Sequence, residues 1–165
     1  MQLKPLSRTA IPGALAKASR YRLLNEPVEA ESICRDILLA DPSNQDALVT
    51  LLLALTDQFD HDLANSVQET RAVLDRLTDE YARAYYSGLV SERRAKAHLR
   101  RAGPGADAAA YEYFREAMGH YERAEAIRPP DNDEALLRWN ACARALMRNP
   151  KLAAAREERF EPYFE

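Results

Sequence analysis

The sequence predicts an all-α protein, and three observations lead to that class. Ala, Leu, Glu and Arg are abundant, whereas only five of the 165 residues are glycine, and this composition favours helices. No segment sustains the alternation of β-branched or aromatic residues with polar ones that is typical of strands. Turn residues divide the chain into segments of helical length.

The first half of the chain is expected to form four helices, at about residues 12–24, 28–40, 44–58 and 62–78. Asn25 tolerates the backbone angles of a turn. Pro27 opens a helix, because the first helical turn has no partner for the missing N–H. Asp41-Pro42 ends a helix, because the residue before a proline is pushed out of the helical region.

The second half is expected to form four more helices, at about residues 80–101, 106–128, 132–148 and 150–158. Gly103-Pro104-Gly105 is the strongest helix breaker in the chain and predicts a tight turn between two long helices. Pro129-Pro130 ends the second of these helices, and Pro150 opens the last helix of the chain.

One turn sequence occurs twice. Residues 41–48 read Asp-Pro-Ser-Asn-Gln-Asp-Ala-Leu, and residues 129–136 read Pro-Pro-Asp-Asn-Asp-Glu-Ala-Leu. They share Pro, Asn, Ala and Leu in register, with an acidic residue just before the Ala-Leu pair. Both follow an apolar helix, so the same joint between helices is predicted at both places.

Residues 11–44 resemble a tetratricopeptide repeat, a helical hairpin of about 34 residues. Ala18 and Ala30 lie where that family has small residues for close helix contact, and Tyr21 lies at an aromatic position. Residues 41–44 match the terminal turn of the family. The resemblance is clearest over 11–44 and looser over 45–148, where the matching positions include two small residues and one aromatic: Gly88, Ala117 and Tyr121.

The resemblance implies antiparallel helical hairpins stacked as a short right-handed α-solenoid. A single domain over 1–165 would contain hairpins at about 12–40, 44–78, 80–128 and 132–158. The third hairpin is elongated, since each of its helices is about 22 residues, or roughly 33 Å, long.

The resemblance also implies a protein–protein interaction module or scaffold, whose concave groove binds a peptide or helix of a partner protein. The groove is lined by the first helix of each hairpin. Its expected residues are Leu15, Ser19, Arg22, Val49, Leu53, Thr56, Tyr85, Leu89, Leu137, Ala141 and Arg144. The subgroup that clamps a chaperone's C-terminal carboxylate has Lys, Asn and Arg at several of these places. Leu15, Ser19, Val49 and Leu53 depart from that pattern, which argues against such a partner.

Two other binding functions remain open. The long 80–128 hairpin could drive self-association of a structural or assembly subunit, giving a homo-oligomer. Arg93, Lys96 and Arg100 share one helix face that could contact phosphates. Two observations argue against nucleic-acid binding. The 23 basic and 26 acidic residues nearly balance, and no aromatic residue lies within 93–101 to stack on bases.

The sequence gives little support to a catalytic function. No phosphate loop, zinc helix, paired Cys-x-x-Cys or nucleophile elbow is present, so we expect no enzymatic activity, no metal and no cofactor. The densest set of metal-ligand types is the turn from Asp57 to Asp62, Asp-Gln-Phe-Asp-His-Asp. A solvated turn that caps the next helix is favoured there over a cation site, because the spacing matches no defined metal loop.

The two cysteines, Cys34 and Cys142, both lie within apolar helical patterns. Two buried thiols in a reducing, cytoplasmic setting are expected, rather than a disulfide framework. No apolar run approaches the length of a membrane span, so no membrane association is expected. The acidic, aromatic tail 157–165 is predicted either to cap the preceding helices or to dock on a neighbouring molecule.

Overall fold

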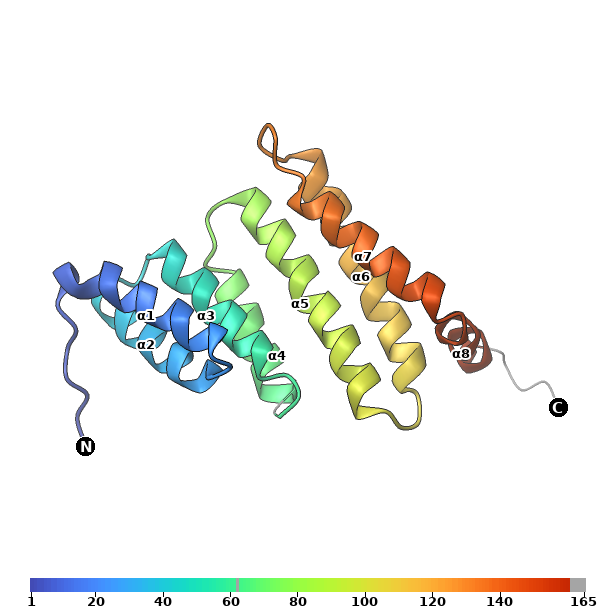
Figure 1. Cartoon of the computed structure of the whole chain (residues 1–165), viewed down its shortest axis with the longest axis horizontal. Helices are drawn as coiled ribbons and strands as arrows, with labels where there is room; N and C mark the ends of the chain where they lie inside the picture. Colours follow the sequence, from blue (N-terminus) through green and yellow to red (C-terminus); the bar gives the residue numbers. More distant parts are fainter. Residues whose placement is uncertain (62, 161–165) are drawn as a thin grey trace. The chain divides into compact units, whose positions relative to one another are not determined.

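The chain is all-α, as predicted. A computed structural model describes residues 1–61 and 63–160, except for the side chains of Asn65 and of 156–160. These residues form helices and no strand (Figure 1). The helices are α1 (Ile11–Leu23), α2 (Pro27–Ala40), α3 (Gln45–Asp57), α4 (Leu63–Leu74), α5 (Glu80–Arg101), α6 (Ala106–Ala126), α7 (Glu134–Arg148) and α8 (Lys151–Phe160). A 3₁₀ turn at Arg8–Ala10 precedes α1.

The chain forms two compact units, Met1–Thr78 and Asp79–Glu165. The division falls after the second of the four predicted hairpins. The single domain over 1–165 stays a prediction, and each unit is described by itself below.

Unit 1 contains α1 to α4. Each helix packs against the next, and α1 also packs against α3. The core holds two residues of the predicted small positions, Ala18 and Ala30, together with Cys34 and the larger Ile37 and Leu52, all with no exposed surface. The small side chains let their helices approach closely, and the larger ones fill the space between them.

The turn between α2 and α3 explains where α3 begins. The side chain of Asn44 accepts a hydrogen bond from the Ala47 amide at 2.9 Å, which satisfies one of the unpaired N–H groups of the first helical turn. The side chain of Gln45 accepts a bond from the Thr78 amide at 2.9 Å, and the Arg76 guanidinium donates to the Pro42 carbonyl at 2.7 Å. The segment after α4 is thereby tied to this turn.

Unit 2 contains α5 to α8, and α6 is its central helix. α6 packs against α5, α7 and α8. Asp79 caps α5 through a 2.7 Å bond from the Ala82 amide. The predicted break at 103–105 forms the turn between α5 and α6, where Gly103 and Gly105 both adopt positive φ. Glycine is suited to those angles because it lacks a Cβ.

The close contact between α5 and α6 is made by Gly88 and Tyr121. A Cβ atom built on Gly88 would lie 2.6 Å from the ring of Tyr121, so only glycine leaves room for that ring. Tyr121 itself is completely buried. The small position and the aromatic position that the sequence analysis singled out separately are therefore direct partners.

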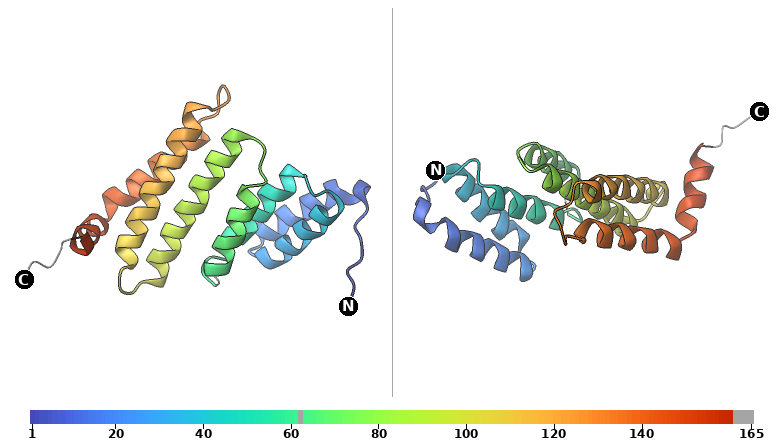
Figure 2. Two further views of the ribbon diagram at one scale, coloured as in Figure 1. Left: turned by 180° about the vertical axis from the view of Figure 1, so that it is seen from behind. Right: turned by 90° about the horizontal axis from the view of Figure 1, so that it is seen from above.

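The last helix differs from the expected arrangement. The sequence predicted a hairpin over 132–158, in which α8 would pair with α7. Instead, α8 packs chiefly against α6 and turns away from the direction of α7 (Figure 2). The physical reason is that Leu152, at the start of α8, enters the same core as Ala135 and Cys142 of α7 and Ala117 of α6. The buried side of α7 already packs against α6, so α8 packs against α6 as well and contributes to the same core.

Candidate protein-binding surfaces

In unit 1, α1 and α3 lie side by side and carry the first group of predicted groove residues. Ser19 is exposed, and Leu15, Val49 and Leu53 are partly exposed. We call these four residues the α1–α3 face. They combine apolar surface with one small polar side chain, on helices held by the core behind them.

One end of the α1–α3 face is closed by an ion pair. The Arg22 guanidinium donates to the Asp57 carboxylate at 2.8 Å, and both side chains are about a quarter exposed or less. Behind this pair, Gln58 donates to Glu31 at 2.7 Å, which joins α2 to the end of α3. The pair therefore fixes the ends of α1 and α3 relative to each other.

Two of the predicted groove residues offer no surface to a partner. Thr56 is 4% exposed and Leu89 is 2% exposed. The Thr56 hydroxyl donates to the Leu53 carbonyl at 2.8 Å, so its polar group is used within α3. The resemblance that placed Thr56 on the inner side could not distinguish a partly exposed position from one covered by its neighbours.

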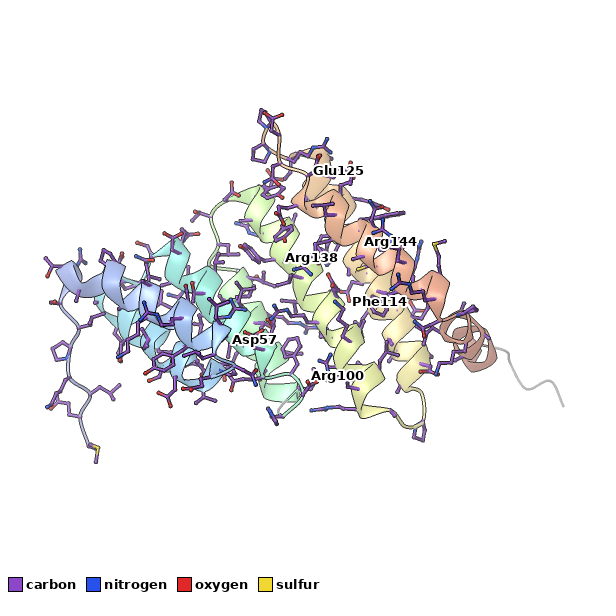
Figure 3. The ribbon with its side chains drawn as sticks, in the orientation of Figure 1. Asp57, Arg100, Phe114, Glu125, Arg138 and Arg144 are labelled. Carbon is purple, nitrogen blue, oxygen red and sulfur yellow. The ribbon has the colours of Figure 1, made fainter. Side chains whose placement is uncertain are left out.

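The remaining predicted groove residues belong to unit 2. Leu137, Ala141 and Arg144 are exposed on α7, with Leu137 60% exposed. Figure 3 labels Arg144 on this helix. Tyr85 of α5 is partly buried. Its hydroxyl donates to Glu134 at 3.4 Å, and its ring lies 5.9 Å from that of Tyr121. Tyr85 therefore helps to join α5 to α7, while the α7 residues face outward.

A buried carboxylate that the sequence analysis missed joins three helices of unit 2. Glu92 is 1% exposed. It accepts a bond from the Tyr121 hydroxyl at 2.7 Å and forms ion pairs with Lys96 at 2.5 Å and Arg138 at 3.5 Å. A buried charge needs such partners. The four-residue spacing of Glu92 and Lys96 was the available signal for one of these pairs.

Besides burial, the negative charge of Glu92 also shifts the pKa values of two buried neighbours, Tyr121 and Cys142. Burial, and secondly the negative charge of Glu92, raise the pKa of the Tyr121 phenol far above its usual range. The same two causes raise the pKa of the Cys142 thiol from 9.0 to about 12. In unit 1, burial raises the pKa of the Cys34 thiol to about 11, although the charge of Arg22 opposes the shift. Both cysteines are free and buried, so neither thiol is a reactive nucleophile.

The predicted basic face on α5 is partly neutralised. The Lys96 ammonium is bound to Glu92, Arg93 is partly buried, and Arg100 is exposed. Next to these residues, the Arg94 guanidinium lies 3.9 Å from the ring centroid of Tyr113. His98 stacks on the same ring, and its pKa is lowered by burial and then by nearby arginines. The face therefore presents less positive charge than its sequence indicates.

The turn that begins at Asp57 does not gather metal ligands in the part of the chain that the structure describes. Asp57 faces Arg22, and Asp60 and His61 are exposed. Asp62 lies outside the described residues. Among the side chains that the structure describes, no three of His, Cys, Asp or Glu form a group that could hold a metal ion.

Two further predictions concern the membrane and the tail. None of the described helices combines the length and the apolar character needed to cross a bilayer. In the tail 157–165, residues 161–165 and the side chains of 157–160 lie outside the described part.

Comparison of the chain with models of protein families, with curated proteins and with solved structures gave no match.

Proposed function

We propose that this protein binds a segment of another protein along the α1–α3 face, as a tetratricopeptide-like interaction module. The observation that carries the proposal is that α1 packs against both α2 and α3. The first helices of two consecutive hairpins therefore lie together, with Leu15, Ser19, Val49 and Leu53 left exposed or partly exposed on them. Faces of this kind, rigid and moderately apolar, suit an extended or helical peptide.

The small-residue positions support the solenoid-like stacking that the proposal assumes. Ala18 and Ala30 have no exposed surface, as the resemblance to the repeat family requires of close helix contacts. The long α5–α6 hairpin has an equivalent contact, in which the ring of Tyr121 lies against Gly88. Buried small residues let helices approach closely, which stacked helical hairpins need in order to bury their apolar surfaces against each other.

The chemistry of the face indicates what kind of segment it would take. Leu15, Val49 and Leu53 offer aliphatic contacts, and Ser19 leaves space for a guest side chain. The Arg22–Asp57 ion pair at one end presents both charges, so it suits a polar end of the segment rather than a strongly charged one. The partner would therefore be a segment with small or aliphatic side chains at its centre, and its affinity would come mainly from burying them.

Site-specific photo-crosslinking tests the proposal. A photoreactive amino acid replaces Ser19 in the full-length protein, and it replaces Ser32 in a matched control, because both serines are exposed but Ser32 lies on α2. We expect a defined adduct with a partner protein from position 19 and not from position 32. Leu53→Glu, placed in the Ser19 probe, should remove that adduct, because it puts a charge into the apolar part of the face.

The melting curve of the Leu53→Glu protein must remain cooperative for this loss to be informative. Ser19→Arg, which adds bulk at an exposed position, provides a second test in the protein without the probe: it should reduce co-purification of the identified partner. Equal adducts from positions 19 and 32, or no adduct at position 19, would contradict binding along this face.

A further inference from the structure

The outer side of α7 carries one continuous stripe of residues. Glu134, Leu137, Ala141, Arg144 and Arg148 are all exposed and follow each other at alternating spacings of three and four. This is the spacing that keeps residues on one side of a helix and forms the contact seam of paired helices. The opposite side of α7, with Ala135 and Cys142, is buried in the core of unit 2. We call the five residues the α7 stripe.

The α7 stripe is apolar at its centre. Leu137 is 60% exposed, and Met147, which borders the stripe, is 78% exposed. Ala141 adds a small side chain between Leu137 and Arg144. An exposed leucine next to an alanine offers both a large side chain and the space to receive one.

The two ends of the α7 stripe carry opposite charges. Glu134 lies at the start of α7, and Arg144 and Arg148 lie at its end. An identical helix that runs antiparallel would bring acidic ends to basic ends twice, once on each side of a two-fold axis. The register that sets Leu137 opposite Ala141 of the second copy also sets Glu134 opposite Arg144 of that copy. One alignment of the two α7 helices therefore pairs both the apolar residues and the oppositely charged residues.

We propose that the α7 stripe is a self-association surface, on which a second copy of this chain docks by antiparallel pairing of the two α7 helices. The contact covers only part of a helix about 22 Å long, so the dimer is weak and depends on concentration. This surface is not the 80–128 hairpin, from which self-association was expected, and it does not depend on the binding proposed for the α1–α3 face. Each proposal can fail without the other.

Charge reversal provides a direct test. Sedimentation velocity of the full-length protein over a range of concentrations should detect a monomer–dimer equilibrium. Glu134→Lys and Arg144→Glu, made in separate proteins, should each weaken it by about tenfold or more, since each puts two pairs of like charges at the contact. An equimolar mixture of the two variants should dimerise again. In a mixed dimer the two substituted side chains, a lysine and a glutamate, face each other on one side, and the unchanged Glu134 and Arg144 face each other on the other side.

The recovery on mixing separates this arrangement from damage to the fold. Glu134→Lys also loses the bond from the Tyr85 hydroxyl, but such a loss cannot be repaired by a second protein. Arg115→Glu makes the same charge change as Arg144→Glu at an exposed site on α6 and should leave the equilibrium unchanged. A monomer at all concentrations, variants that dimerise like the starting protein, no recovery on mixing, or an equal effect of Arg115→Glu would each overturn the proposal.

Discussion

Gly88 allows the ring of Tyr121 to lie directly on α5. The missing Cβ would come within 2.6 Å of that ring, and the ring is held in place by its bond to Glu92. We therefore expect Gly88→Ala to lower the free energy of unfolding by about 1–3 kcal/mol through overpacking. Urea denaturation followed by circular dichroism measures this change.

Gly119 offers a matched control on the neighbouring helix. It also lies within a helix, but nothing occurs within 4 Å of the Cβ that a substitution would add. Gly119→Ala should thus leave stability unchanged or raise it by up to about 1 kcal/mol, since alanine is the better helix former. Equal effects of the two substitutions would show that helix propensity, and not the contact with Tyr121, governs position 88.

Two residues of α5 differ in how well their roles could be predicted from the sequence. Gly88 was singled out as a small contact because the resemblance to helical repeats specifies such positions. Glu92, in contrast, was not singled out. Its burial depends on Tyr121 and Arg138, which are 29 and 46 residues away in the chain, and periodicity within one helix carries no information about such distant partners.

At the scale of elements, the sequence predicted every helix that the structure describes. Proline, glycine or asparagine marks most of the turns, but the breaks at 58–62 and 75–79 contain none of these residues. The predicted 80–101 coincides with α5, and α1 and α3 begin and end within one residue of expectation. The largest difference is in α4, which ends at Leu74 although helix was expected to 78. The amides of Arg76 and Leu77 bond to carbonyls three residues back, so the chain tightens into a turn there.

The packing of α8 was the part of the fold that element prediction missed, and it provides a test. Leu152 has no exposed surface and enters the α6 core, so we expect Leu152→Ala to destabilise the protein by about 2–5 kcal/mol. Leu137→Ala removes the same atoms from an exposed side of α7 and should change stability by no more than about 0.5 kcal/mol.

Thermal unfolding of both leucine variants at a concentration where the protein is monomeric would compare them. If Leu152→Ala cost as little as Leu137→Ala, α8 would not be an integral part of the core of unit 2. The comparison is informative because the two substitutions are chemically identical and differ only in burial.

At the scale of the whole molecule, each unit contains one buried thiol. Burial raises the pKa of Cys34 from 9.0 to about 11 and that of Cys142 from 9.0 to about 12. Above pH 9 the unfolded chain therefore loses its thiol protons before the folded protein does. The folded state then binds more protons, so the free energy of unfolding falls as pH rises, by roughly 1.4 kcal/mol per pH unit for each thiol within its window.

Denaturant unfolding at several pH values between 8 and 10 would measure this decline, in the range where tyrosines contribute least. The double variant Cys34→Ala, Cys142→Ala should be less stable at pH 8, because it loses packed sulfur atoms. Its stability should nevertheless change less between pH 8 and pH 10. An identical slope in the two proteins would mean that other groups control the alkaline response.

The hydrogen bonds at the end of unit 1 have a consequence for biosynthesis. Gln45 bonds to Thr78 and Arg76 bonds to Pro42, so the last residues of unit 1 are tied back to the turn between α2 and α3. Both bonds can form as soon as residues 76–78 have emerged from the ribosome. The amino-terminal helices can therefore begin to pack together while the second half of the chain is still being translated.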